Sequence, residues 1–245
     1  APSGYNCTSL SNPNPNDPWN GAISRNYAGT DTKADTYAMY VFDTLELSQQ
    51  WLLNMGLRYD HFETDYKTFD GSGVTTAKDK DTSEFVTGQF GVVYKPAENG
   101  SIYASYATSA TPPGNTLGEG SEGNPLGGGT VNNDLKPETT KNYEIGTKWD
   151  LLNDQLSLTA DIFHTEKENA RVQVNTNTYE NAGKTRVQGV ELSATGRITD
   201  KWQVFAGYAY MDSEQIDGGD MPLNRANNGN ELPNTPKNSA SLWTT

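Results

Sequence analysis

Apolar and polar residues alternate with a period of two along much of this chain, most clearly within residues 135–170. In residues 156–162, Leu, Leu, Ala and Ile alternate with Ser, Thr and Asp. This period is typical of a β-strand with two different faces. Residues 143–149 alternate in the same way, and the turn-forming pair Asn153-Asp154 lies between the two runs. The stretch therefore predicts a β-hairpin with one apolar face.

The same pattern predicts about nine strands in the whole chain. They are expected at residues 34–46, 51–62, 83–94, 101–108, 143–149, 156–162, 185–194, 202–212 and 238–245. Residues 1–33 are expected to be loop. Short turns near residues 48, 97, 152 and 198 alternate with long polar loops near residues 72, 124, 175 and 224. A transmembrane barrel has short periplasmic turns and long extracellular loops, whereas a soluble sandwich has no reason to gather its long loops at one end.

The two faces of the predicted strands support a barrel wall between lipid and water. Along one face of residues 51–59, Trp51 and Tyr59 flank Leu, Met and Leu. Eight residues rise about 26 Å, or about 20 Å when the strand is tilted, which fits a lipid band between aromatic girdles. The opposite faces carry charges that a dry core would have to pair, but a watered lumen would not. These charges are Arg58, Asp60, Glu144, Lys148, Asp161 and Glu191.

The predicted fold class is therefore all-β, an antiparallel transmembrane β-barrel with long extracellular loops and short periplasmic turns. A bacterial outer-membrane barrel closes with an even number of strands. Nine strands cannot close, so we expect residues 1–245 to be part of one larger barrel domain.

Composition narrows the class of protein further. Only 33% of residues are hydrophobic and the mean hydropathy is −0.75, but 13 Tyr and 5 Trp argue for a folded, β-rich chain with much loop. The net charge of −13 argues against a nucleic-acid partner, which requires a basic surface. Residues 1–21 lack the basic start and apolar run of a signal peptide, so the sequence is expected to begin inside a longer protein. The single cysteine, Cys7, is expected to have a partner upstream or to be a free thiol.

Several motifs, occurring in the same order, resemble the barrel of TonB-dependent outer-membrane receptors. They are the hairpin at residues 36–62, LKPE at Leu135–Glu138, YEIGTK at 143–148, LSLTADIF at 156–163, NAG at 181–183, RVQGVEL at 186–192 and LPNTPK at 232–237. Among the subfamilies, the chain is most similar to siderophore receptors, and in particular to the catecholate type.

The resemblance implies a barrel of about 22 strands, plugged by an N-terminal globular domain, in the outer membrane of a Gram-negative bacterium. It implies uptake of a ferric siderophore, powered through the TonB complex, with this chain as the central barrel portion. The plug, the TonB-contacting segment and the C-terminal strands are not in the sequence, so the fragment alone is expected to be inactive.

No enzyme site is expected, and no cofactor bound by the protein itself. The iron of a ferric siderophore arrives already held by the ligand's oxygens, so a receptor needs aromatic faces and cations for an often anionic complex. The loop and rim candidates are Arg25, Tyr27, Tyr66, Arg171, Tyr179 and Arg225. Each of them could instead be an ordinary solvated loop residue. The lumen charges, such as Arg58 and Glu144, are expected to hold the plug or to pair across strands.

Metal binding by the protein is not expected. His61 and His164 are each placed where a strand enters an external loop, and neither has a Cys or a second His at ligand spacing.

Two other functions remain open from the sequence. The barrel could be a plug-free channel or adhesin, which a plug domain encoded upstream would exclude. The chain could also be a soluble extracellular β-sandwich that binds carbohydrate by stacking it on Tyr and Trp.

Overall fold

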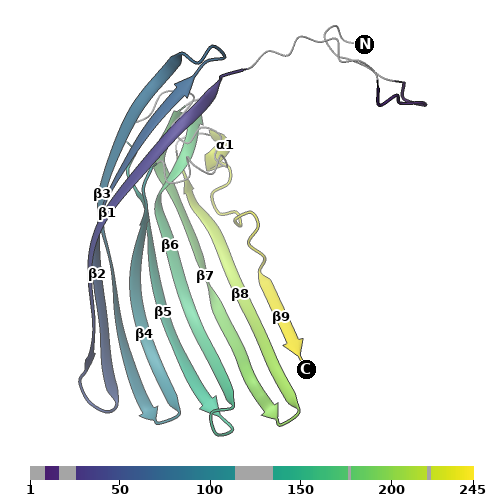
Figure 1. Ribbon diagram of the computed structural model, residues 1–245. Coiled ribbons are helices and arrows are strands. Elements are labelled where there is room, and N and C mark those ends of the chain that lie inside the picture. The colour runs from purple at the N-terminus through teal and green to yellow at the C-terminus, as the bar shows by residue number, and fades with distance from the viewer. Residues whose placement is uncertain (1–8, 17–25, 114–134, 176–177, 220–221) are drawn as a thin grey trace.

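The chain forms one curved antiparallel sheet in a computed structural model that describes residues 9–16, 26–113, 135–175, 178–219 and 222–245 (Figure 1). Nine strands lie in the order β1-β2-β3-β4-β5-β6-β7-β8-β9, so every strand pairs with its neighbours in sequence. The strands β1 and β9 form the two edges of the sheet. The predicted strand number and pairing are confirmed, and the sheet has the form of a section of barrel wall.

The strands are longer than the alternation alone indicates. Their bounds are β1 Gly29–Glu46, β2 Trp51–Phe69, β3 Thr75–Ala97, β4 Gly100–Thr111, β5 Glu138–Leu151, β6 Leu156–Asn175, β7 Thr178–Thr199, β8 Trp202–Gly218 and β9 Asn238–Thr244. The helix α1 is a single turn, Pro222–Arg225, between β8 and β9. Within the described residues, no helix combines the length and the apolar composition needed to cross a membrane.

One end of the sheet carries the four short turns, as predicted. They occupy residues 47–50, 98–99, 152–155 and 200–201. In the turn between β5 and β6, Leu152, Asn153 and Asp154 all have positive φ, between 56° and 62°. Asn and Asp tolerate this left-handed conformation because their side chains hydrogen-bond to the nearby backbone.

At the other end, two of the four predicted long loops are wrong. Most of residues 63–81 continue β2 and β3 as a hairpin, with Asp65 opposite Lys80 and a turn of only residues 70–74. The strands β6 and β7 likewise stay paired to Asn175 and Thr178. Beyond the apolar band the outer face of a strand contacts water instead of lipid, so strand pairing continues there without an apolar outer face to mark it. For the same reason β1 begins before residue 34 and β8 runs past residue 212.

Only two connections at this end are long. The chain between β4 and β5 covers residues 112–137, of which 114–134 lie outside the described residues. The chain between β8 and β9 covers residues 219–237 and includes α1.

The outer face of the sheet is a band of exposed apolar side chains. Leu57 is 61% exposed, and Ile145 and Ile162 are each 55% exposed. Aromatic pairs lie at both borders of this band: Trp51 and Tyr94 have ring centroids 4.7 Å apart near the short turns, and Tyr106 and Tyr143 have centroids 4.9 Å apart at the opposite border. The predicted arrangement of aromatic girdles around an aliphatic middle is therefore confirmed.

Within the part of the chain that the structure describes, all nine strands belong to this one sheet, and no second layer buries either face. Among the described residues, the buried apolar side chains are Phe62, Tyr66, Leu135 and Val204. A β-sandwich packs two sheets face to face over a shared core. This architecture therefore contradicts the soluble sandwich that the sequence left open.

Candidate functional site

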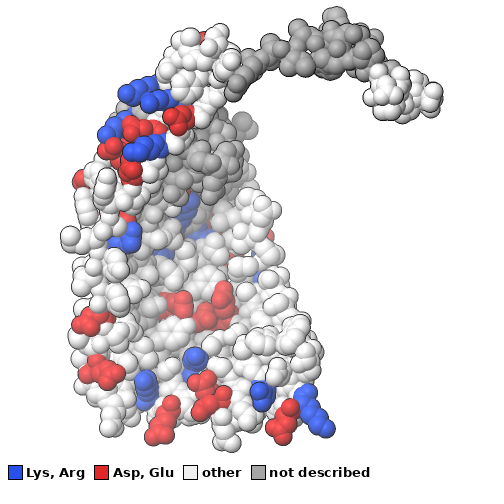
Figure 2. Space-filling view, in the orientation of Figure 1, with Lys and Arg blue, Asp and Glu red and all other residues white. Residues whose placement is uncertain are grey.

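The inner face of the sheet carries an acidic patch near the middle of the wall. Figure 2 shows acidic side chains in the hollow of the sheet. Strand register places Asp161 on β6 opposite Glu191 on β7, and Gly146 on β5 opposite Asp161. Glu144 lies on the same face and accepts a hydrogen bond from the Tyr103 hydroxyl at 2.6 Å. The three carboxylates are close enough to repel one another, so this patch favours cations over an anionic ligand.

A row of buried residues lies on the inner face of β2, in the half of the strand that leads to the β2–β3 turn. Every second residue from Asp60 to Tyr66 is buried, including Phe62 at 7% exposure and Tyr66 at 8%. Arg58 donates to both carboxylate oxygens of Asp60 through Nε, at 3.0 and 2.8 Å, and its Nη2 lies 2.7 Å from Oδ1. Arg58 thus pairs with a residue on its own strand, not across strands.

Also on the inner face, β5 and β6 carry a partly buried ion-pair cluster around Glu138. The Glu138 carboxylate accepts the backbone N–H of Arg171 at 2.8 Å and lies 2.5 Å from Lys167 Nζ. The Nε atom of Arg171 lies 3.5 Å from Glu138 Oε1, and both side chains are only about a tenth exposed. Burial by itself would raise the pKa of Glu138, but the bonds to Lys167 and to the Arg171 backbone, with both positive charges, lower that pKa below its ordinary value.

The six residues expected to contact the ligand lie in different settings. Tyr66 and Arg171 point to the interior, from β2 and β6 respectively. Tyr27 is 54% exposed, and its backbone N–H donates to Gly71 O in the β2–β3 turn at 3.1 Å. Arg225 is exposed at the end of α1. Arg25 and the side chain of Tyr179 lie outside the described residues.

Sequence reasoning overlooked Lys167 and Glu138 as members of the cluster around Arg171. Glu138 was visible only as the last residue of the LKPE motif. Its role depends on strand register, because Glu138 lies 33 residues from Arg171 in the chain. A run of Glu, Lys and Arg at residues 166–171, in a predicted polar loop, was the only available signal.

The two histidines lie within strands on the outer face, so their predicted placement at strand–loop junctions is wrong. His61 Nδ1 lies 3.0 Å from Glu84 Oε1, and His164 Nε2 lies 3.2 Å from Glu166 Oε1. Because β2 and β6 continue well past them, each histidine lies just beyond the aromatic border. Within the part of the chain that the structure describes, no group of three His, Cys, Asp or Glu side chains is arranged to hold a metal ion.

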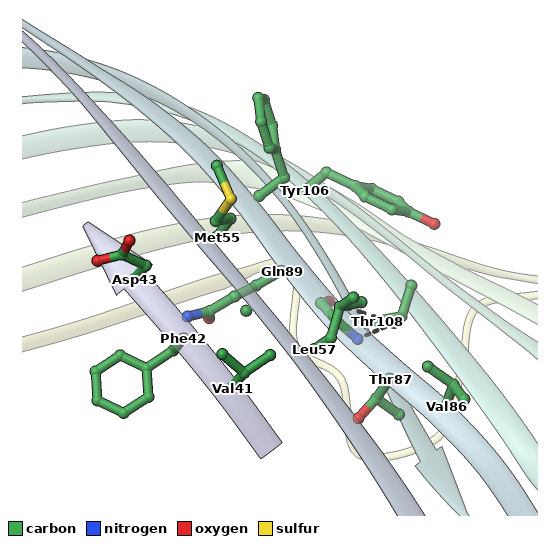
Figure 3. A pocket seen from close by; sticks show the side chains of 13 residues that line it. Val41, Phe42, Asp43, Met55, Leu57, Val86, Thr87, Gln89, Tyr106 and Thr108 are labelled. Atoms are coloured by element: carbon green, nitrogen blue, oxygen red, sulfur yellow. Dashed lines mark hydrogen bonds between the residues drawn. The ribbon is translucent and has the colours of Figure 1, made fainter. Parts of the chain in front are cut away.

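A large hollow among the described residues lies mainly on the outer face and does not suit an anionic ligand. Its volume is about 660 Å³, and it spans β1 to β4 (Figure 3). Met55, Leu57, Val86 and Tyr106 are prominent in its apolar lining, and Asp43 is the one charged residue among those lining it. A surface of this kind fits the apolar band, so we place the ligand-facing wall on the inner side.

The fold, the apolar outer band and the polar interior define a section of a β-barrel wall. Comparison with known proteins identifies the family of this chain. The family described as TonB dependent receptor-like, beta-barrel, matches residues 2–245. This chain belongs to that family, and the members of the family are transport receptors.

Individual relatives are siderophore receptors. The chain is 44% identical over 221 residues to the probable TonB-dependent siderophore receptor PiuA of Acinetobacter baumannii, covering 88% of this chain and 30% of that protein. It is 34% identical over 244 residues to the catecholate siderophore receptor Fiu of Escherichia coli K12, covering 91% of this chain and 31% of Fiu. The chain thus spans about a third of the length of these curated relatives.

Solved structures support the same assignment. The crystal structure of the siderophore receptor PiuA from A. baumannii matches with a TM-score of 0.78 at 43% identity, over 88% of this chain and 31% of that one. The closed form of the ferric-catecholate import receptor Fiu from E. coli K12 matches with a TM-score of 0.75 at 32% identity, over 97% of this chain and 35% of that one.

Proposed function

We propose that this chain is the central barrel portion of an outer-membrane receptor that takes up a ferric siderophore of the catecholate type. The observation that carries the proposal is the similarity to PiuA and Fiu over about nine-tenths of the chain. The exposed apolar band between two aromatic borders supports a location in the outer membrane. The family name supports coupling to the TonB complex as the energy source.

The proposed process is transport without catalysis, and the protein needs no cofactor of its own. The iron is cargo and arrives inside the siderophore. An anionic ferric complex would meet Lys167 on the inner wall, where that side chain is 42% exposed and lies beside the nearly buried Arg171. Tyr66, on the inner face of β2, remains a candidate although it is only 8% exposed. The other loop and rim residues expected from the sequence remain candidates for ligand contact: Tyr27, Arg225, Arg25 and Tyr179.

We also propose that the acidic patch of Glu144, Asp161 and Glu191 faces a plug domain that the complete receptor carries. A patch of three carboxylates suits basic side chains of such a domain and repels an anionic ligand. The patch is one argument against the alternative of a plug-free channel or adhesin.

The test is growth of the source bacterium, with the gene deleted, under iron limitation and with one siderophore supplied at a time. We expect growth and uptake of radioactive iron to fall with at least one ferric catecholate, and a plasmid copy of the complete gene to restore both. Normal uptake with every siderophore tested would contradict the function. A complete reading frame that encodes no plug domain would favour the channel.

A further inference from the structure

The strand pairing in the barrel wall changes where β5 begins. Backbone pairing between β5 and β6 reaches only as far as Thr139 opposite Glu168. The pairing of β6 with β7 continues further, to Asn175 opposite Thr178. Residues 169–175 of β6 therefore extend beyond the paired part of β5, and Leu135–Pro137 lead into β5 at this level as irregular chain.

The side chain of Asn181, on β7, joins this irregular segment to the wall. Its Oδ1 accepts the backbone N–H of Lys136 at 2.6 Å, and its Nδ2 donates to the Lys136 carbonyl at 3.0 Å. The same Nδ2 donates to the carbonyl of Asn169 at 2.7 Å. A primary amide has one oxygen and two N–H donors. The Asn181 side chain thus replaces a missing backbone rung and also fixes β6.

The third contact falls where β6 is irregular. Asn169 has a φ of 55°, and the β6–β7 register shifts between Lys167 and Arg171. Such a bulge redirects the side chains that follow it. Because the Asn169 carbonyl is bonded to Asn181, the turn of the backbone that precedes Arg171 is held in place.

Glu138 holds the other side of the same bulge. Its carboxylate accepts the backbone N–H of Arg171 and lies within ion-pair distance of Lys167 Nζ and Arg171 Nε. Leu135, three residues earlier, is 6% exposed and packs the segment against the wall. Asn181 and Glu138 therefore secure one short segment of β6 from two directions.

We propose that Asn181 and Glu138 are positioning residues for ligand binding. Together they attach the residues before β5 to β6 and β7 and hold Lys167 and Arg171 at fixed places on the inner face, where an anionic ligand passes. This inference rests on the proposed function, which supplies the anionic ligand. It also assigns one physical role to the LKPE and NAG motifs, which lie more than 40 residues apart in the chain.

The test uses the complete receptor in detergent, with Asn181→Asp as the main variant. Aspartate has nearly the same shape and still accepts the Lys136 N–H, but its carboxylate cannot donate to the Lys136 and Asn169 carbonyls. The matched control is Asn99→Asp in the β3–β4 turn. Asn99 Nδ2 also donates to a backbone carbonyl of a neighbouring strand, that of Asp150 at 2.9 Å, but at the opposite end of the wall.

The probe is ferric 2,3-dihydroxybenzoate, a simple anionic catecholate complex, followed by quenching of tryptophan fluorescence. We expect Asn181→Asp to weaken binding of the probe about ten-fold. Asn99→Asp should leave the dissociation constant unchanged. If Asn181→Asp binds the probe as tightly as the wild type does, or if both variants weaken binding equally, the positioning role is wrong.

A second readout separates this inference from the proposed function. Amide hydrogen exchange should be faster in Asn181→Asp at residues 135–138 and 169–171, and unchanged at residues 47–50. If the wild-type receptor does not bind the probe, the ligand assignment has failed. Hydrogen exchange then tests separately whether Asn181 holds residues 135–138 against the wall. Unchanged protection of these residues in Asn181→Asp would show that it does not.

Discussion

At the scale of single residues, the charged cluster on the inner wall shows how burial and pairing act against each other. Glu138 is nearly buried, which disfavours its charge, yet two cations and a backbone N–H stabilise the ionised form. A buried charge that loses its partner is costly, because the remaining charge is left unpaired in a medium of low polarity. Removing the charge of Glu138, or that of its cationic partners, should therefore lower the free energy of unfolding.

The lowered pKa of Glu138 makes its contribution depend on pH. A carboxyl group whose pKa is lower in the folded state stabilises that state above its unfolded pKa, and this stabilisation is lost as the pH falls through the folded pKa. The ordinary value is 4.5. At pH 7, Glu138→Gln should lower the free energy of unfolding by about 1–3 kcal/mol.

The difference between Glu138→Gln and the wild type should shrink as the pH falls below the ordinary value, because the carboxyl of the unfolded state is protonated first and the folded state only below its lower pKa. Urea or guanidinium unfolding of the complete receptor in detergent, at pH 7 and pH 3.5, measures the difference. Glu98→Gln, at an exposed position in the β3–β4 turn, is the control. A difference that stays constant with pH would show that the charge of Glu138 does not contribute.

Part of this cluster could be found from the sequence. Arg171 was a candidate because a cation in a loop at the rim suits an anionic ligand. The parts played by Glu138 and Asn181 could not be found, because they depend on a register shift in β6 that no local pattern records. Side-chain alternation determines which face a residue occupies, but a bulge changes that count by one.

At the scale of elements, the short turns follow from local chemistry and the outer hairpins do not. Asn153-Asp154 indicated the β5–β6 turn, since both residues tolerate a left-handed backbone. The β2–β3 and β6–β7 hairpins extend far beyond the apolar band, and their outer faces there are polar, so the apolar outer pattern ends where the lipid is expected to end. The alternation thus reports the apolar band and not the full length of the strands.

Leu152 is the residue in the β5–β6 turn that local chemistry does not explain. It has a φ of 56°, which costs a residue with a Cβ roughly 1–2 kcal/mol, and its side chain is 52% exposed. Leu152→Gly should therefore stabilise the receptor by about 0.5–1 kcal/mol. The β-branched Leu152→Val should destabilise it. Unfolding midpoints of the two variants check the prediction, and the opposite order would contradict the left-handed turn.

At the scale of the whole molecule, a single open sheet has to obtain its stability from its surroundings. Both edges, β1 and β9, present backbone groups for further strands, and the outer face leaves apolar side chains bare. The apolar face is unfavourable in water, and the backbone groups at the two edges would be unpaired in lipid. A barrel completed by further strands, with lipid outside and water inside, would meet both requirements, and this arrangement makes a prediction at two adjacent residues.

Leu192 and Ser193, neighbours on β7, face opposite sides of the wall. Leu192 is on the outer face at 46% exposure, and the Ser193 hydroxyl bonds to that of Thr159 on the inner face at 2.5 Å. In lipid, Leu192→Lys should cost about 2–4 kcal/mol, because a charge near the middle of the bilayer is desolvated. Ser193→Lys should cost far less, since its ammonium group reaches water and lies on the same side as the acidic patch. The folded fraction in outer-membrane extracts, measured by gel mobility before and after heating, compares the two. In a protein surrounded by water, both substitutions would be nearly neutral, so equal behaviour of the two variants would contradict the lipid-facing assignment.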